Sequence, residues 1–314
     1  MVPWVTLRQL TSMSATRADQ LDPAVLAALG HLELVARWVV DGFITGLHRS
    51  PRKGFSVEFA EHRPYIPGDD LRYLDWRIAA RADRWVVKQF EEETNARAMI
   101  VLDVSRSMQW SGDTARLTKL SYAERLAAAI ALLLIRQRDA VGLVRFDAGL
   151  RSVVPPRAQR AQWRRLVAAL SEPGGGAASD VAGALMQAGR LVRRPGFVVL
   201  ISDLLVDAAP VADAARTLRA RGHEVLVLHV LDPAERDFPE FGEALYRDPE
   251  SQDEVAAAPA DVRASYQATV QAALSEWRAA LGRAGARYAV ATTDDPFGRP
   301  LRQLVGSNGR GAMV

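Results

Sequence analysis

Three oxygen-bearing side chains follow a short apolar run in the segment MIVLDVSRSMQ. They are Asp103, Ser105 and Ser107, at alternate positions after residues 99–102. A carboxylate and two hydroxyls are hard oxygen ligands of the kind that suits Mg²⁺, which keeps several of its waters in proteins. If the chain turns sharply here, the three oxygens can face one ion. Aspartate and serine are also common where a strand ends in a capped turn, so the spacing alone leaves both interpretations open.

Two distant segments carry the same kinds of oxygen. Asp203 follows the apolar run FVVLIS, and Ser179 precedes Asp180, which we expect to be the N-cap of a helix. In a doubly wound sheet, ligands bind outside the carboxyl ends of the strands, where the strand order reverses. We therefore expect one site for one Mg²⁺ (or Mn²⁺ or Ca²⁺) ion, bound directly or through water, with a position open to a partner's carboxylate. Its expected ligands are Asp103, Ser105, Ser107, Ser179 and Asp203.

The hydrophobic pattern predicts the elements that position these residues. From residue 97 onward, near-continuous Val, Ile and Leu runs alternate with amphipathic stretches. This pattern predicts an α/β fold, with a doubly wound, mostly parallel sheet flanked by helices. The predicted strands are residues 97–104, 140–146, 150–156, 196–202, 223–231 and 286–292. The predicted helices are residues 120–138, 160–170, 180–192, 211–222 and 268–285.

The same pattern divides the chain into parts. They are a flexible extension (1–20), a helix followed by a small β-rich subdomain (21–96), the α/β domain (97–305) with an insertion at about 232–267, and a flexible tail (306–314). The helix is expected at 23–41. Residues 55–59 and 85–90 alternate like half-buried strands, and Pro67–Asp70 predicts a turn. The glycines at 174–176 are expected to be a flexible connector, because no Lys-Ser/Thr pair follows them as in a phosphate-binding loop.

Composition limits the classes of function. The 314 residues include no cysteine, which excludes thiolate metal sites and cysteine nucleophiles, and the five histidines show no HExxH spacing. The 40 Lys and Arg nearly balance the 37 Asp and Glu, and no basic run is interleaved with aromatics, so nucleic acid is not an expected partner. No segment reaches the roughly 18 apolar residues of a membrane span, and no signal pattern is visible, so the expected location is the cytoplasm.

The segments DVSRS, GAASD and VLISD resemble the metal-ion-dependent adhesion site (MIDAS) of von Willebrand factor A domains. That family has the pattern D-x-S-x-S, then a distant threonine, then a distant aspartate after an apolar strand. Ser179 stands where threonine is usual, which keeps the hydroxyl but loses the methyl group that restricts its rotamer. Leu204 follows Asp203 where many members have glycine. The resemblance implies a von Willebrand factor A-like fold with one metal ion bound by the five residues.

The stretch at residues 65–93 resembles the signature of the bacterial family called domain of unknown function 58, and HVLDPAERDFPEFG fits it as well. The resemblance covers residues from about 40 to 295. Members of this family look like partners of MoxR-type AAA+ ATPases. The resemblance therefore implies a non-enzymatic adaptor or co-chaperone, whose metal site binds the ATPase or a client protein through an acidic side chain.

Two other hypotheses stay open at this point. One is a Mg²⁺-dependent phosphoester hydrolase that uses a metal-bound water, with Asp180 or Asp203 as the base. The sequence contains no G-x-S-x-G motif and no nucleotide fingerprint that would favour other catalysis. The other hypothesis is a structural domain whose site holds no ion.

Overall fold

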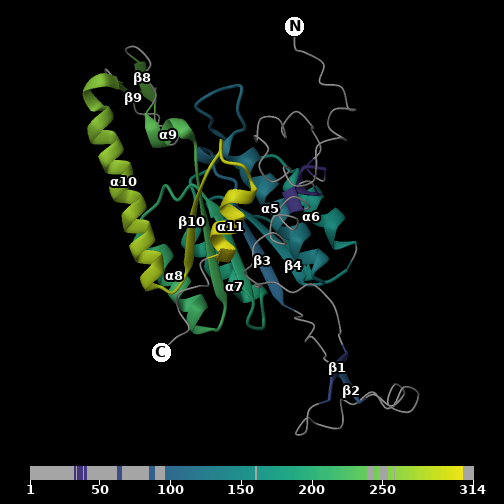
Figure 1. Cartoon of the computed structure of the whole chain (residues 1–314). Coiled ribbons are helices and arrows are strands. Elements are labelled where there is room, and N and C mark those ends of the chain that lie inside the picture. The colour runs from purple at the N-terminus through teal and green to yellow at the C-terminus, as the bar shows by residue number, and fades with distance from the viewer. Residues whose placement is uncertain are drawn as a thin grey trace. The chain divides into compact units, whose positions relative to one another are not determined.

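The structure is a computed structural model of the chain (Figure 1). It describes residues 32, 34–37, 39–40, 62–65, 85–88, 96–159, 161–238, 244–247, 254–257 and 259–306. The chain divides into two compact units, residues 50–95 and the remainder, and each is described by itself.

A six-stranded sheet forms the centre of the larger unit. Its strands, labelled as in Figure 1, are β3 (Arg97–Asp103), β4 (Ala140–Phe146), β5 (Leu150–Arg157), β6 (Phe197–Ser202), β7 (Glu224–Leu231) and β10 (Arg287–Thr292). The strand order is β10-β7-β6-β3-β4-β5, and all neighbours are parallel except β4 and β5. The chain moves outward from β3 in one direction and outward from β6 in the other, so the order reverses between β3 and β6. The predicted doubly wound, mostly parallel sheet is confirmed.

Helices cover both faces of this sheet (Figure 1). They are α5 (Lys119–Arg136), α6 (Gln162–Leu170), α7 (Val181–Leu191), α8 (Ala208–Ala220), α10 (Pro259–Arg283) and α11 (Gly298–Gly306). Successive strand side chains point to opposite faces. Ile100 and Leu102 of β3 therefore join a core with α5, α6 and α11, whereas Met99 and Val101 join a core with α7, α8 and α10. Burial on both faces explains why β3 is a continuous apolar run.

The insertion predicted at about 232–267 lies between β7 and β10 and has secondary structure of its own. It holds a short helix, α9 (Pro233–Asp237), and an antiparallel hairpin of β8 (Ala244–Arg247) and β9 (Glu254–Ala257). The next helix, α10, begins at Pro259 and not at residue 268. Proline is favoured at the first position of a helix. The sequence that follows, ADVRASYQ, has few large apolar residues, so its periodicity could not reveal these turns. Across the described residues, no helix combines the length and the apolar character needed to cross a bilayer.

In the smaller unit, β1 (His62–Pro64) pairs antiparallel with β2 (Val86–Lys88), which agrees with the strand predicted at 85–90. The rings of Tyr65 and Trp85 beside this pair lie 6.0 Å apart. The predicted strand at 55–59 and turn at 67–70 lie outside the described residues, as do residues 1–20, residues 307–314 and much of the predicted helix at 23–41. The described residues between 32 and 40 are helical.

The two outer strands of the large sheet differ in character. β5 carries Pro155 and Pro156, which have no N–H to donate to a further strand, and prolines are typical of protected sheet edges. The opposite outer strand, β10, reads RYAVAT and contains no proline. In the described part of the chain, no strand pairs with its outer side.

Arg145 of β4 ties the sheet to the loop that follows α6. Its side chain is 1% exposed, and its guanidinium donates to the backbone carbonyls of Glu172 and Pro173 at 2.6 and 3.1 Å. It also pairs with the carboxylates of Glu172 at 3.2 Å and Glu124 at 3.8 Å. A planar group with five donors suits such a set of acceptors. Burial raises the pKa of Glu124 to about 7, although the charges of Arg145 and Arg125 oppose this.

The raised pKa of Glu124 predicts a pH-dependent stability. The folded chain holds this proton more tightly than the unfolded chain, where the pKa is near 4.5. The free energy of unfolding therefore falls as pH rises from about 4.5 to about 7, and the cost is complete above pH 7. We expect the free energy of unfolding of E124Q, relative to that of the parent, to rise by up to about 3 kcal/mol from pH 5 to pH 8. Denaturant unfolding of both proteins at each pH measures this difference.

A matched control for this prediction is E172Q. Glu172 also pairs with Arg145, but its side chain is half exposed, so this variant reports the loss of a charge without the loss of a buried carboxyl. If the difference between E124Q and the parent does not change with pH, the prediction is wrong.

Candidate metal site at the carboxyl edge of the sheet

Asp103 is the last residue of β3 and lies at the point where the strand order reverses. Its side chain is fully buried. Its Oδ2 accepts hydrogen bonds from the hydroxyls of Ser179 and Ser202, both at 2.7 Å, and its Oδ1 accepts one from the backbone N–H of Ser105 at 2.9 Å. Burial raises the pKa of Asp103 above its ordinary value, and the nearby charge of Asp203 adds to this, while the hydrogen bonds oppose it.

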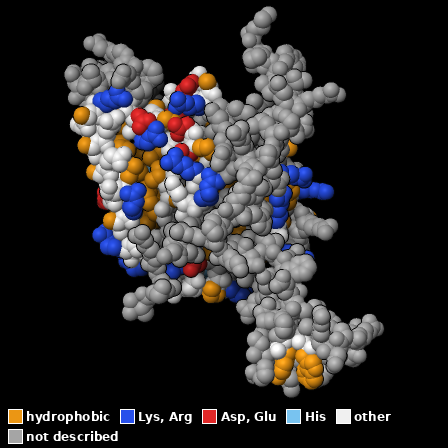
Figure 2. Space-filling view, in the orientation of Figure 1, with side chains coloured by type: hydrophobic (Ala, Val, Ile, Leu, Met, Phe, Trp, Pro, Cys, Tyr) orange, Lys and Arg blue, Asp and Glu red, His pale blue; other side chains and the backbone are white. Residues whose placement is uncertain are grey.

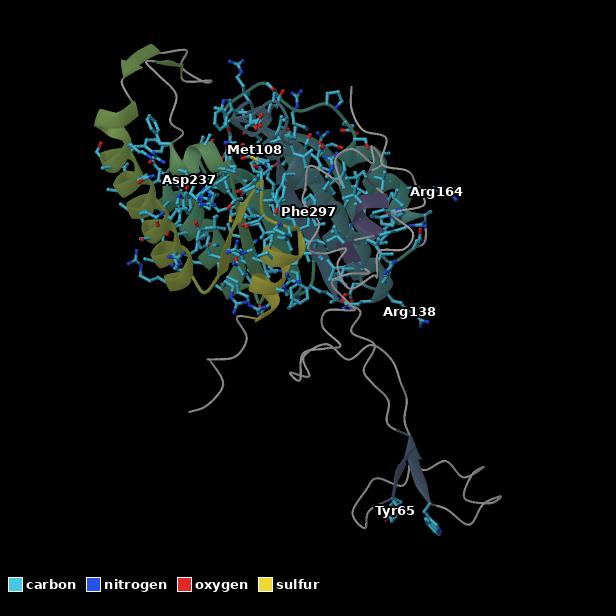
Figure 3. All side chains as sticks on the ribbon, turned by 45° about the horizontal axis from the view of Figure 1, so that its top comes forward. Tyr65, Met108, Arg138, Arg164, Asp237 and Phe297 are labelled. Atoms are coloured by element: carbon cyan, nitrogen blue, oxygen red, sulfur yellow. The ribbon has the colours of Figure 1, made fainter. Side chains whose placement is uncertain are left out.

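The turn after β3 brings Ser105 and Ser107 together. The bond from the Ser105 N–H to Asp103 is an Asx-turn, in which an aspartate side chain mimics a backbone turn. A single 3₁₀ turn, Ser107–Gln109, follows. The Oγ atoms of Ser105 and Ser107 lie 3.2 Å apart, and both residues are buried. The sharp turn that the spacing required is therefore present. Figure 3 labels Met108 of this turn at the end of the domain opposite Arg138.

The glycine segment before α7 brings Ser179 to Asp103. The prediction of a flexible connector is wrong, because this segment packs against the turn after β3. The Gly175 N–H donates to the carbonyl of Val104 at 2.6 Å, and the Arg106 N–H donates to the carbonyl of Ala177 at 3.3 Å. A Cβ at Gly175 would meet the Asp147 carboxylate and lie 3.0 Å from the Val104 carbonyl. Glycine is therefore required here by close approach of the backbone.

Asp203 follows β6 and is buried beside Asp103. The next residue, Leu204, has a φ of 52°, in the left-handed region that glycine favours. The Leu204 N–H donates to the Ser202 hydroxyl at 3.0 Å, which closes the turn. The loop therefore takes a glycine-like conformation although leucine occupies the position, and burial of the Leu204 side chain offsets the strain.

Lys119, at the start of α5, holds Asp203 from the other side. Its Nζ lies 2.9 Å from Asp203 Oδ2 and also pairs with Glu235 of α9. Burial alone would lower the pKa of this ammonium, but the charges of Asp203 and Glu235 outweigh it and raise the pKa of Lys119. The ring of Trp110 lies 5.8 Å from Nζ, within range of a cation–π contact. Lys119 is thus a fixed positive charge at this edge of the sheet.

His229 supports the backbone of this edge. It lies opposite Ser202 in the β6–β7 register, its Nδ1 is 2.7 Å from the hydroxyl of Tyr288, and it has a hydrogen bond with the Asp203 backbone. Burial lowers the pKa of His229 to about 4, so the ring is neutral near pH 7. These contacts pack the His229 ring between Tyr288 and the backbone at Asp203.

The oxygens around Asp103 fit a hard divalent cation. In the described part of the chain, no lysine, arginine or histidine pairs with Asp103, so its charge is compensated only by neutral donors. No three His, Asp or Glu side chains gather among the described residues, so hydroxyls and water would have to complete the coordination. Asp103, Ser105, Ser107 and Ser179 are hard donors of this kind. Asp203 differs, because the ammonium of Lys119 already takes one of its oxygens.

Three residues of this edge were not predicted from the sequence, namely Ser202, Lys119 and Glu235. Ser202 directly precedes Asp203 and has no separate signal. Glu235 could have been placed by the capping box that begins at Asp232. There the Asp232 side chain accepts from the Ala234 N–H at 2.8 Å, and the Glu235 side chain accepts from the Asp232 N–H at 2.9 Å. Lys119 is one of only three lysines among the 40 Lys and Arg residues, but that scarcity does not indicate its position.

Both candidate bases of the hydrolase hypothesis are engaged elsewhere. Asp180 is the N-cap of α7, as predicted, and its Oδ1 accepts from the Gly183 N–H at 2.9 Å. Asp203 is paired with Lys119. Because the Lys119 ammonium binds one oxygen of Asp203 and the Gly183 N–H binds one oxygen of Asp180, this geometry does not favour the hydrolase hypothesis.

The buried ion pairs of Lys119 predict strong coupling in a double-mutant cycle. K119M leaves Asp203 and Glu235 buried without their cation, so we expect a loss of about 3–5 kcal/mol in the free energy of unfolding. D203N removes one of the stranded charges, so K119M/D203N should lose at least about 1 kcal/mol less than the sum of the single losses. Urea unfolding measures all four proteins.

Arg116 supplies the control, since its ion pair with Asp113 in the same region is exposed. R116M should cost less than about 1 kcal/mol. Additive losses in the Lys119–Asp203 cycle would show that the two side chains act independently.

Comparisons with known proteins found relatives in sequence and in structure. A chain of Mycobacterium tuberculosis (strain H37Rv), described as an uncharacterized protein, is 34% identical over 243 residues, which cover 76% of this chain and 75% of the relative. An aerotolerance-related membrane protein from Bacteroides fragilis is 17% identical, with a TM-score of 0.47 over 67% of this chain and 98% of that one. The SpRpn10 VWA domain is 11% identical, with a TM-score of 0.41 over 69% of this chain and 98% of that one. We draw no functional conclusion from either structure.

The family comparison matches residues 61–276, which are more than half of the chain, to the family described as "Protein of unknown function DUF58". The match includes the segment at 65–93 on which the resemblance rested, and both carboxylates of the candidate site. With a family match of this extent and a relative at 34% identity, the chain belongs to the DUF58 family.

Proposed function

We propose that this chain is a non-enzymatic, divalent-metal-dependent protein-interaction module, which acts as an adaptor or co-chaperone of a MoxR-type AAA+ ATPase. The observation that carries the metal part is the buried Asp103 carboxylate. It receives three neutral hydrogen bonds and, among the described residues, has no cationic partner. A buried charge without a counterion is costly, and a bound cation would remove that cost.

Asp103, Ser105, Ser107 and Ser179 would hold the ion, most simply Mg²⁺. When bound, the ion would supply a coordination position for a carboxylate from outside. Asp203 would contribute through water, since Lys119 neutralises it. That neutralisation leaves the site with few anionic ligands, so an acidic side chain of a partner protein would be attracted to the ion.

Two exposed apolar side chains flank this edge and support a protein partner. Trp110 follows the 3₁₀ turn after β3 and is 38% exposed, and Leu205 follows Asp203 and Leu204 and is 59% exposed. Tryptophan is enriched at the centres of protein interfaces, where it excludes water from neighbouring polar contacts. An apolar rim beside a metal-bound carboxylate would add both affinity and orientation. The nature of the partner rests on the family resemblance, which implies a MoxR-type AAA+ ATPase or its client.

Metal binding predicts a stabilisation that depends on Asp103. An ion that binds only the folded chain at 100 times its dissociation constant should raise the free energy of unfolding by about 2.7 kcal/mol. We expect MgCl₂ or MnCl₂ to raise the midpoint of thermal unfolding of the parent chain. D103N and S179A should lose this increase, because each removes or weakens an oxygen ligand.

D180N is the matched control, since Asp180 lies beside Ser179 but caps α7 and is exposed, and asparagine caps equally well. It should keep the metal-dependent increase. No increase in the parent with Mg²⁺, Mn²⁺ or Ca²⁺ would favour the structural hypothesis with an empty site.

Partner binding is tested by capture of a purified MoxR-type ATPase from the same organism on the immobilised chain, with Mg²⁺ or with EDTA. We expect capture with Mg²⁺, a loss of at least tenfold with EDTA or D103N, and a loss with W110A, which removes the proposed apolar contact. Capture that is equal under all conditions contradicts the metal part. A lack of capture under any condition contradicts the choice of partner. A separate assay with a panel of phosphoesters tests the alternative, and turnover that D203N abolishes would favour the hydrolase instead.

A further inference from the structure

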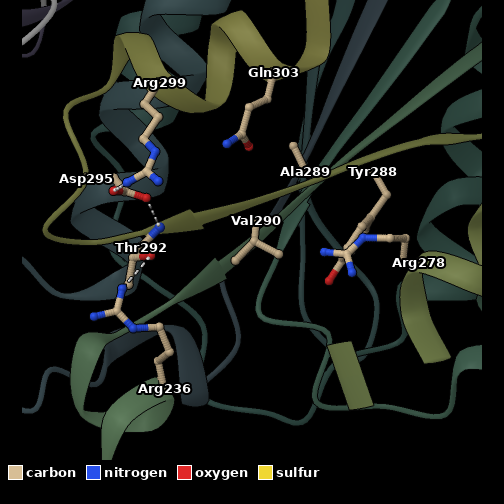
Figure 4. A pocket seen from close by; sticks show the side chains of 9 residues that line it. All are labelled: Arg236, Arg278, Tyr288, Ala289, Val290, Thr292, Asp295, Arg299 and Gln303. Atoms are coloured by element: carbon tan, nitrogen blue, oxygen red, sulfur yellow. Dashed lines mark hydrogen bonds and ion pairs between the residues drawn. The ribbon is translucent and has the colours of Figure 1, made fainter. Parts of the chain in front are cut away.

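The outer edge of β10 opens into a cavity of about 400 Å³ (Figure 4). It is separate from the Asp103 site and is built by β10 together with residues of α9, α10 and α11. Arg236, Arg278, Arg299 and Asp295 line it together with residues of β10.

Three consecutive residues of β10 line this cavity, namely Tyr288, Ala289 and Val290. Consecutive strand residues point to opposite faces of the sheet. Ala289 belongs to the core on the α5 side, whereas Tyr288 packs against the core on the α8 side. A cavity that meets all three therefore extends along the edge of the strand and does not lie over one face.

The backbone of this edge is available over a short length. In the described part of the chain, no strand pairs with the outer side of β10. At its carboxyl end, the Thr292 N–H donates to Asp295 Oδ2 at 3.3 Å, so this N–H is not available to an added strand. The open stretch is thus residues 288–290, long enough for a few backbone hydrogen bonds to an added strand.

The charge around this edge is positive. Three arginines and one carboxylate line the cavity. Arg299 donates to Asp295 at 2.6 Å, and Arg236 pairs with Asp237 beside it. In the described part of the chain, no carboxylate pairs with Arg278, which comes from α10 and lies next to Tyr288 in Figure 4. Figure 2 shows Lys and Arg side chains around an apolar strip beside α10.

We propose that the outer edge of β10 binds an extended, acidic peptide segment of a partner protein, which adds a strand to the sheet. Backbone hydrogen bonds to β10 supply the pairing, and alternate side chains of the peptide reach the arginines and the apolar surface. Carboxylates suit these arginines, because guanidinium groups form charge-assisted bonds with them. This binding does not depend on the ion or on Asp103.

The experiment measures fluorescence anisotropy of a labelled, end-capped peptide (Glu-Val)₄ with the full chain, in EDTA so that the metal site plays no part. We expect saturable binding that weakens as NaCl is raised. (Lys-Val)₄ should not bind. The (Glu-Val)₄ peptide with every backbone nitrogen methylated should not bind either, because it keeps the charges but has no N–H to pair with the strand.

R278E reverses a charge that pairs with no carboxylate among the described residues, and R164E makes the same change on the exposed surface of α6. We expect R278E to weaken binding by about tenfold or more, and R164E to leave it unchanged, with both variants unfolding at the parent's temperature. Equal binding by R278E, equal binding of the methylated peptide, or no binding of (Glu-Val)₄ up to 1 mM overturns the proposal. If the methylated peptide also binds, and pyrophosphate displaces the peptides, the cavity is a small-anion pocket instead.

Discussion

A carboxylate inside a protein must be compensated, and Asp103 is compensated by hydroxyl and backbone donors instead of a cation. Its three hydrogen bonds come from Ser105, Ser179 and Ser202, which belong to three different segments. The arrangement of the loops follows from this one group, because the turn after β3, the glycine segment and the end of β6 all converge on it. Such bonds lower the cost of burying a carboxylate but supply no opposite charge.

The second carboxylate of the edge has a different counterpart. Asp203 is neutralised by Lys119, which also reaches Glu235, so α5, β6 and α9 are joined through one ammonium. A lysine suits this position because its compact charge can bond to two separate carboxylates at once. The two aspartates are therefore not equivalent, although the linear pattern presents them as members of one ligand set. Asp203 already has a cation inside the fold, whereas the proposed function assigns an external cation to Asp103.

The fold was largely predictable, because strands buried on both faces leave continuous apolar runs and Asp103 and Asp203 each follow one. The start of α10 was not, since its first turns lack apolar periodicity. Within the site, Asp103 and the serines at 105, 107 and 179 were predicted from their places at strand and loop ends, whereas Ser202 was not. Lys119 was not, because a lysine at the start of a helix usually faces solvent, and only the packing of α5 against β6 and α9 buries it. The role of Gly175 depends on close approach of two loops, which no local pattern encodes.

The two edges of the sheet have unequal chemistry, and this limits how such a molecule can assemble. An edge that ends in Pro155 and Pro156 accepts no further strand in that region, whereas β10 has no such block. Among the described strands of this sheet, β10 is therefore the outer strand without a proline block. A sheet that adds a strand at one edge alone forms a pair or binds one partner strand, whereas growth of a fibre needs addition at both edges.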